Sequence, residues 1–426
     1  MLRVYYDLSM KIKAYKIVHN HIEKIMPRLE RLPTGRIPFS FLLITYGHFY
    51  PEQIYCWDYY HMAIRFAYAG KPDYLKYLID TLLYYQSPDG FTPNCITEKS
   101  GPMHYFPKFH AQPFLMQGAL VYLFQTGNLR WVKEQFDKLK KYLEYYWYNN
   151  LTHLGLFRWS VSWMSGIDND VTTSFSLPET IITADINAWL YLECRSATIL
   201  ASRLGKKNDE KIFKEKAKTL HQLVNDILWY EEMSSYSAYN LLTGTHHFHL
   251  GKGTESERVG YYAFQSCSNL IPLYAQMADR KRAIDMIKKY LLHEKHFWSP
   301  YGIRSLSKSS PYYNNAIFGN PPRFGEHHRM TNSNWQGPVW TLLNYFMFHA
   351  LIHYGFKKEA EELVDKTMFL LASSLEKIGS FTENYDAETG QPLFAPGYGS
   401  WNILMDMMYQ ELRSGKWIMD PIFEEI

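Results

Sequence analysis

The chain has 426 residues, of which 46% are hydrophobic, 17% aromatic and 20% charged, enough for one large core or two ordinary ones. A formal net charge of +3 provides no basic field for nucleic-acid binding, and no run of about 18 apolar residues predicts a membrane span. The four cysteines, Cys56, Cys95, Cys194 and Cys267, are scattered, so we expect no metal site. The first residues lack a secretory pattern, which favours a cytoplasmic protein.

Helical periodicity dominates the chain, and strict alternation is rare. A first amphipathic helix is predicted over residues 8–32. Apolar helices are then predicted to begin near residues 57, 112, 185, 261, 335 and 401 and to end at turns near 70, 127, 205, 279, 355 and 415. Most of these turns contain glycine, the usual residue just after a helix. Charged helices are expected between them, over residues 134–141, 210–218, 280–289 and 357–366.

This alternation predicts an all-α fold. Five apolar and charged pairs, a sixth apolar helix and the N-terminal helix provide the parts of an (α/α)6 barrel of six inner and six outer helices. We expect residues 1–426 to form one such domain, with the 8–32 helix completing the outer ring. An open solenoid is the alternative, but the turns at 70, 127 and 205 are too unequally spaced for regular repeats.

Polar and aromatic residues concentrate just before the apolar helices, more than core packing requires. They are Trp57-Asp58, Phe109 to Pro113, Trp163 to Asp170, Asn334 to Trp340, Glu383 to Tyr385, and Trp401. In a toroid these loops face one end of the central cavity. The 35 Tyr and 12 Trp suit a carbohydrate site there. The Pro-, Ser- and Asn-rich segment 294–333 is predicted to form a long loop over the cavity.

Two acids stand out in these loops. Asp168 lies on a turn with Gly166 and Asn169, five residues after Trp163. A carboxyl beside an indole is well placed to have a raised pKa and to donate a proton. Taken alone, however, this stretch also fits an Asx-turn or a helix cap. Glu383 precedes a predicted turn over residues 386–390 and, taken alone, also fits a surface carboxylate.

Six stretches together resemble glycoside hydrolase family 63 and its relatives, the mannosylglycerate and glucosylglycerate hydrolases, in their short single-domain form. The stretches are Tyr55 to Tyr60, Ala111 to Phe114, Ser165 to Asn169, Asp185 to Ala188, Asn334 to Trp340, and Glu383 to Gly390. The resemblance implies that Asp168 is a general acid and Glu383 a general base. The sugar-contacting residues that it implies are Trp57, Asp58, Gln112, Trp163, Trp335, Gln336, Gly337, Trp340 and Trp401. The family often has Arg where Gln336 stands.

The resemblance also implies an inverting mechanism, in which the two carboxyls lie roughly 6.5–9.5 Å apart. Burial should keep Asp168 protonated, and Glu383 should be ionised. We expect an exo-acting α-glycosidase without a cofactor, acting on small α-glucosides. The alternative substrates are mannosyl- and glucosylglycerate, whose carboxylate would need Arg258, Arg323 or Arg329, with Tyr261, Tyr262, Tyr312 and Tyr313 nearby.

Two other classes remain open. An (α/α)6 sugar isomerase or epimerase works with histidines, for which His246 to His249 and His327-His328 are candidates. A sugar-binding protein without catalysis is the other class, although acids occupy both expected catalytic positions. The sequence leaves the oligomeric state open.

Overall fold

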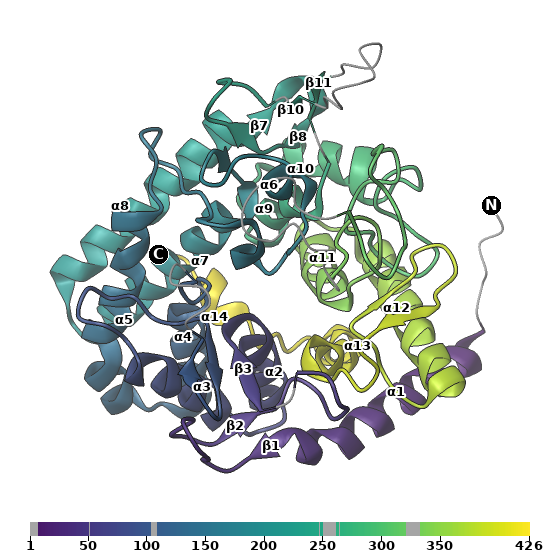
Figure 1. The fold of residues 1–426 in the computed structure, drawn as a ribbon, viewed down its shortest axis with the longest axis horizontal. Coiled ribbons are helices and arrows are strands. Elements are labelled where there is room, and N and C mark those ends of the chain that lie inside the picture. Colours follow the sequence, from purple (N-terminus) through teal and green to yellow (C-terminus); the bar gives the residue numbers. More distant parts are fainter. Residues whose placement is uncertain are drawn as a thin grey trace.

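The computed structural model describes residues 7–50, 52–103, 109–246, 248–249, 261–263, 265–320 and 333–426. Within these ranges the protein is mostly helical, as predicted, and the helices surround a common centre (Figure 1). None of the described helices combines the length and the apolar character that crossing a membrane requires.

The helices nearest the centre are those predicted to be apolar. They are α2 (Cys56–Tyr68), α4 (Leu115–Thr126), α7 (Ala184–Arg203), α9 (Ile271–Tyr274), α11 (Thr341–His353) and α13 (Met405–Ser414), the last preceded by the 3-10 helix η6 (Ser400–Leu404). Each contacts the next, and η6 also contacts α2, so the contacts return to the first helix. Nearly every residue of α2 and α11 is buried, as expected for helices at the centre of a large protein.

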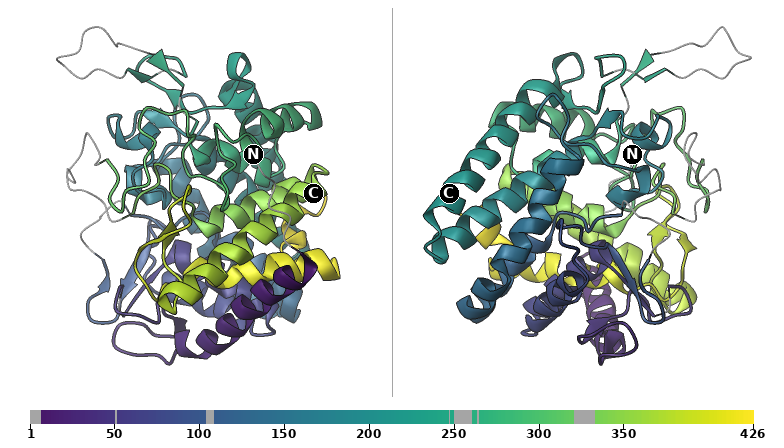
Figure 2. Two further views of the ribbon diagram at one scale, coloured as in Figure 1. Left: turned by 90° about the vertical axis from the view of Figure 1, so that its right-hand side faces the viewer. Right: turned by 60° about the vertical axis from the view of Figure 1, so that its left-hand side comes forward.

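The helices that alternate with these along the chain carry many of the charged residues. They are α1 (Leu8–Leu29), α3 (Asp73–Tyr84), α5 (Leu129–Asn149), α8 (Lys207–Leu223), α10 (Arg280–Met286) and α12 (Lys357–Ile378). Helix α3 packs on α2, α5 on α4, α8 on α7, and α12 on α11. Helix α1 contacts both α12 and α13, so the first long helix lies beside two helices from the last part of the chain (Figures 1 and 2).

Three predicted boundaries were wrong. The N-terminal helix ends at Leu29, because residues 30–31 form strand β1 with β2. The fourth apolar helix begins at Cys267 instead of near residue 261, because Tyr261–Tyr262 pair as β11 with β10. The fifth begins at Thr341 instead of near residue 335, because the preceding Val339 bridges to Arg304 and Tyr385.

Short strands join the helices in antiparallel pairs and one three-stranded sheet. The strands are β1 (Glu30–Arg31), β2 (Phe41–Leu42), β3 (Gln53–Tyr55), β4 (Cys95–Thr97), β5 (Gly101–Pro102), β6 (Ile181–Ile182), β7 (Trp229–Tyr230), β8 (Ser235–Tyr236), β9 (Tyr239–Asn240), β10 (Phe248–His249), β11 (Tyr261–Tyr262), β12 (Asn384–Tyr385) and β13 (Pro392–Phe394). The shorter helical elements are η1 (Ser162–Ser165), α6 (Val171–Ser174), η2 (Val224–Leu228), η3 (Glu231–Met233), η4 (Cys267–Leu270), η5 (Ile287–Leu291) and α14 (Asp420–Phe423).

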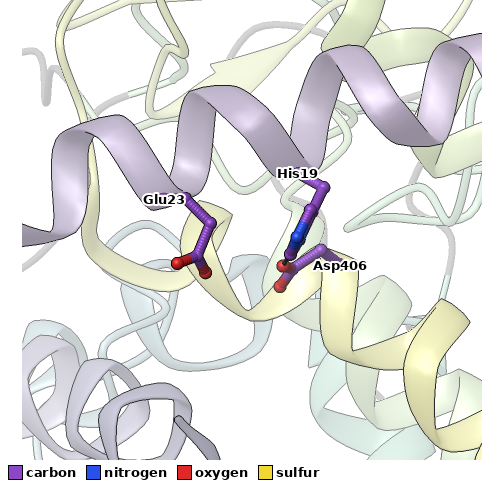
Figure 3. Close-up of side chains that lie close together, drawn as sticks. All are labelled: His19, Glu23 and Asp406. Carbon is purple, nitrogen blue, oxygen red and sulfur yellow. Dashed lines mark hydrogen bonds and ion pairs between the residues drawn. The ribbon is translucent and has the colours of Figure 1, made fainter.

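A largely buried ion-pair network joins α1, α2 and α13 where these three helices meet. The Arg65 guanidinium on α2 donates to both oxygens of Asp406 at 2.9 and 3.0 Å and to Glu23 at 2.7 Å. Nδ1 of His19 lies 2.8 Å from Asp406, and this contact raises the pKa of His19. His19, Glu23 and Asp406 are close enough to hold a metal (Figure 3). Arg65 already supplies the positive charge there, so we interpret the group as a structural network.

Candidate active site

Three carboxyls from distant parts of the chain influence one another at one end of the central helices. Asp58 lies in the first turn of α2, Asp168 follows η1, and Glu383 precedes β12. Ionised Asp58 raises the pKa of Asp168, and both acids raise that of Glu383. Asp58 and Glu383 are buried, at 8% and 5% exposure. The structure therefore brings together the two acids selected from the sequence and the predicted sugar-binding carboxylate.

The turn that carries Asp168 packs directly on Trp57. Gly166 has φ +81°, and a Cβ there would lie 3.0 Å from the Trp57 indole. Any other side chain would meet both the backbone strain and the ring. Glycine at this position thus allows the turn that carries Asp168 to lie directly against Trp57, a predicted sugar-contacting residue.

Asn169 ties this turn to the segment before α11. Its Oδ1 accepts from the backbone N–H of Trp335 at 2.6 Å, and its carbonyl accepts from Nε2 of Gln336 at 2.9 Å. The other end of the Gln336 amide accepts from the backbone and side-chain nitrogens of Asn320 at 2.9 and 2.8 Å. Both ends of the Gln336 amide thus have hydrogen-bond partners, through which this side chain holds the turn that carries Asp168.

The neighbouring acid, Asp170, is a helix cap. Its Oδ1 accepts from the backbone N–H of Thr172 at 2.9 Å at the start of α6, and its Oδ2 accepts from Ser266 at 2.7 Å. The capping interpretation of this stretch therefore applies to Asp170.

Burial raises the pKa of Asp168 to about 7, and repulsion from Asp58 adds to this, while a hydrogen bond from Ser333 opposes it. This agrees with the expectation of a protonated acid. Burial and both neighbouring acids raise the pKa of Glu383 well above its ordinary value, against one opposing bond from Tyr50. This shift runs against the expectation that Glu383 is ionised, because the repulsion comes from residues far away in the sequence.

Asp58 is held by two hydroxyl groups that sequence reasoning missed. Tyr398 and Ser400 both donate to its Oδ1, the latter at 2.7 Å. These bonds oppose the desolvation that raises the pKa of Asp58 to about 6. Their only signal in the sequence is their position next to Trp401.

Glu383 is also held by a partner that the sequence did not indicate. The Tyr50 hydroxyl lies 3.4 and 3.3 Å from the two carboxylate oxygens. The backbone N–H of Glu383 donates to the carbonyl of Phe394 at 2.8 Å, so the β12–β13 hairpin fixes its main chain.

A buried ion pair secures the turn of the same hairpin. The Arg304 guanidinium, 2% exposed, donates to Glu388 at 2.8 Å and to the carbonyls of residues 294, 296 and 298. The Tyr313 hydroxyl donates to the same carboxylate at 2.6 Å. Part of the predicted 294–333 loop therefore acts as a support for the segment that carries Glu383.

Three of the tryptophans predicted to contact sugar pack against one another. Trp335 stacks on Trp340 with ring centres 3.9 Å apart, and Trp340 lies 5.7 Å from Trp401. Trp163 meets Phe109 edge to face at 4.7 Å. Gly337 serves packing, since a Cβ there would lie 2.1 Å from the carbonyl oxygen of Asn314.

Three of the predicted sugar-contacting residues carry buried polar atoms that find no hydrogen-bond partner within the described ranges. These atoms are Nε1 of Trp57, Nε1 of Trp401 and Oε1 of Gln112. The other end of the Gln112 amide donates to the Met164 carbonyl at 3.1 Å. Buried polar groups are costly unless they are paired, so two donors and one acceptor are available for the hydroxyl groups of a ligand.

Several predicted residues lie outside the described residues: Arg258, Arg323, Arg329, His247, His327 and His328. Of the remaining histidine candidates, His246 stacks on Tyr230 at 4.7 Å, and its Nδ1 lies 3.2 Å from the Ala238 carbonyl. Tyr312 packs against Phe175 at 4.6 Å.

The raised pKa of Asp168 predicts a pH-dependent stability. The unfolded chain ionises this group near 3.8 and the folded chain near 7, so its contribution to stability is lost as pH rises through that window. We expect the melting temperature of the wild type, measured relative to that of Asp168→Asn, to fall as the pH rises from about 4 to about 7. Calorimetry of both proteins at several pH values tests this, and a constant difference between them would contradict it.

Known proteins share sequence and fold with this chain. Residues 50–401 match the family model described as mannosylglycerate hydrolase MGH1-like glycoside hydrolase domain. A mannosylglycerate hydrolase of Rubrobacter radiotolerans is 26% identical over 207 residues, which span 48% of this chain and only 37% of that protein.

Solved structures share the fold. The glucose complex of the family 63 mannosylglycerate hydrolase of Thermus thermophilus has a TM-score of 0.70 at 19% identity, covering 92% of this chain and 100% of that one. The neutral trehalase of Saccharomyces cerevisiae has a TM-score of 0.62 at 15% identity, covering 89% and 76%.

Proposed function

Because the chain belongs to the family of mannosylglycerate hydrolase MGH1-like glycoside hydrolase domains, we propose that it hydrolyses small α-linked glycosides with inversion. Asp168 protonates the leaving oxygen, and Glu383 takes a proton from the attacking water. The observation that carries this proposal is the convergence of Asp58, Asp168 and Glu383, each with a raised pKa.

The fold that we propose is an (α/α)6 barrel formed by a single domain. Support comes from the contacts that run round the central helices and from the placement of α1 against α12 and α13. The site acids then lie at the end where the inner helices begin.

The three acids titrate as a coupled group, so the protonation state of one depends on the others. A proton on Asp168 removes one repulsion from Glu383, and the Tyr50 hydroxyl stabilises the ionised form of Glu383. The reactive state in this proposal therefore has Asp168 protonated and Glu383 ionised.

For the substrate, the comparisons favour glycosylglycerates over the neutral α-glucosides that the sequence placed first. The family model and the Rubrobacter relative are both named for mannosylglycerate hydrolase. One matched Thermus structure contains Tris and D-glycerate. The carboxylate of a glycerate substrate needs a positively charged partner. Among the described residues, however, the charged groups that shift the pKa values of Asp168 and Glu383 are carboxylates. We propose that this cation is Arg258, Arg323 or Arg329.

A substrate screen tests this proposal. Mannosylglycerate and glucosylglycerate are assayed beside neutral α-linked disaccharides, with release of reducing sugar as the measurement. We expect the acidic glycosides to be preferred and the preference to be lost in at least one Arg→Ala variant. Preference for neutral disaccharides would restore the order predicted from the sequence, and no release from any α-glycoside would refute the proposed activity.

Asp58→Ala should weaken binding and turnover together. A carboxylate that grips sugar hydroxyls serves the ground state and the transition state alike, so KM rises and kcat falls. Steady-state kinetics on the preferred glycoside measure both constants. Ser400→Ala removes only one bond to Asp58 and should have a smaller effect. Unchanged constants in Asp58→Ala would remove this residue from the site.

A further inference from the structure

Beneath the proposed site, three buried polar atoms have no hydrogen-bond partner in the described part of the chain. They are the hydroxyls of Tyr60 and Tyr345 and Nε2 of His61. Tyr60 and His61 lie on α2 and Tyr345 on α11, and each side chain is at most 3% exposed. Leaving three such atoms unpaired would cost free energy without any compensating contact.

One small cavity is lined by all three of these side chains. Its wall also includes Phe114, Trp189 and Phe346, and these three rings and His61 all pack against Trp57. The cavity leaves about 10 Å³ for the centre of a water molecule, close to what a single water requires.

The protonation states of the three polar groups that line the cavity determine which kind of ligand it can hold. Nδ1 of His61 lies 2.7 Å from the Trp57 carbonyl, so Nδ1 carries the hydrogen and donates it. Burial lowers the pKa of His61 to about 3, so its ring is neutral and Nε2 is an acceptor. Burial also raises the pKa values of Tyr60 and Tyr345 well above their ordinary value, so both hydroxyls stay protonated. This set has no anionic ligand for a metal ion.

We propose that one ordered water molecule occupies this cavity, donating to Nε2 of His61 and accepting from the hydroxyls of Tyr60 and Tyr345. Three partners are the usual number for a buried water. The water fixes the His61 tautomer that donates to the Trp57 carbonyl, and so supports the first turn of α2, which carries Trp57 and Asp58. This inference rests on the fold and is independent of the proposed activity.

A high-resolution crystal structure of the full chain tests it first. We expect one density peak at hydrogen-bond distance, about 2.7–3.2 Å, from all three atoms. An empty cavity with a tyrosine hydroxyl bonded directly to Nε2 of His61 would overturn the proposal. A peak at metal–ligand distances of about 2.0–2.2 Å would also overturn it.

Relaxation dispersion of water oxygen-17 counts long-lived internal waters in solution and does not require crystals. The double variant Tyr60→Phe/Tyr345→Phe keeps the ring volumes but leaves a single polar partner, so we expect one internal water fewer than in the wild type. Tyr274→Phe is the matched control, because this tyrosine lines the same cavity but is not one of the three anchors. An equal count in the wild type and the double variant would contradict the proposal.

Discussion

Asp168→Asn and Glu383→Gln should each lower turnover by about 10²–10⁴-fold, the usual loss when a positioned acid or base is removed. Without Asp168 the glycosidic oxygen leaves unprotonated, and without Glu383 the attacking water keeps its proton. Single-turnover and steady-state kinetics on the preferred glycoside measure the loss. Both variants should stay folded, because each removes a carboxyl that burial makes costly to ionise.

The leaving group separates the two roles. In an aryl α-glycoside with an acidic phenol, the leaving oxygen needs little protonation. The Asp168→Asn variant should therefore hydrolyse such a substrate at close to the wild-type rate. Glu383→Gln should not recover, because the water still needs a base. If Glu383→Gln recovers and Asp168→Asn does not, the acid and base assignments are exchanged. Near-wild-type turnover in either variant on a natural glycoside would remove that residue from the mechanism.

Asp406→Ala should lower the free energy of unfolding by about 3–5 kcal/mol, the range expected when one partner of a buried ion pair is removed. The side chains of Arg65 and Asp406 are 3% and 0% exposed, so the variant leaves a guanidinium buried and poorly compensated. The same variant should weaken the contact between α1 and α13, because His19 on α1 loses its hydrogen bond to Asp406. Denaturant unfolding measures the change.

Glu23→Ala is the matched control for Asp406→Ala. Glu23 binds the same guanidinium, but its side chain is 53% exposed, so its loss should cost less than about 1 kcal/mol. Equal losses in the two variants would contradict the view that burial, rather than charge pairing alone, makes this network important.

The sequence predicted the parts of the fold that depend on local patterns. Apolar helices separated by glycine turns appear where the periodicity placed them, and Gly127 and Gly415 cap α4 and α13 in left-handed conformations. The two-residue strands were missed, because such short pairs are too short to show alternation. The start of α9 was misplaced for the same reason, since Tyr261–Tyr262 belong to a strand pair.

Within the site, the sequence indicated the acids but not the residues that form hydrogen bonds with them. Tyr50 reaches Glu383 across 333 residues, and Tyr398 reaches Asp58 across 340, so no local pattern reveals either contact. The raised pKa of Glu383 has the same origin, because its neighbours Asp58 and Asp168 lie far away in the chain. Gln336 was expected to contact sugar, and only the fold reveals that Asn169 and Asn320 occupy both ends of its amide.

The anomeric form of the first product tests the central claim most directly. Proton NMR during early hydrolysis of an α-glycosylglycerate follows the released sugar before it equilibrates in water. The proposed mechanism predicts that the β-anomer forms first, because water attacks the face opposite the leaving group. Initial release of the α-anomer would contradict inversion and the pairing of Asp168 with Glu383 as acid and base.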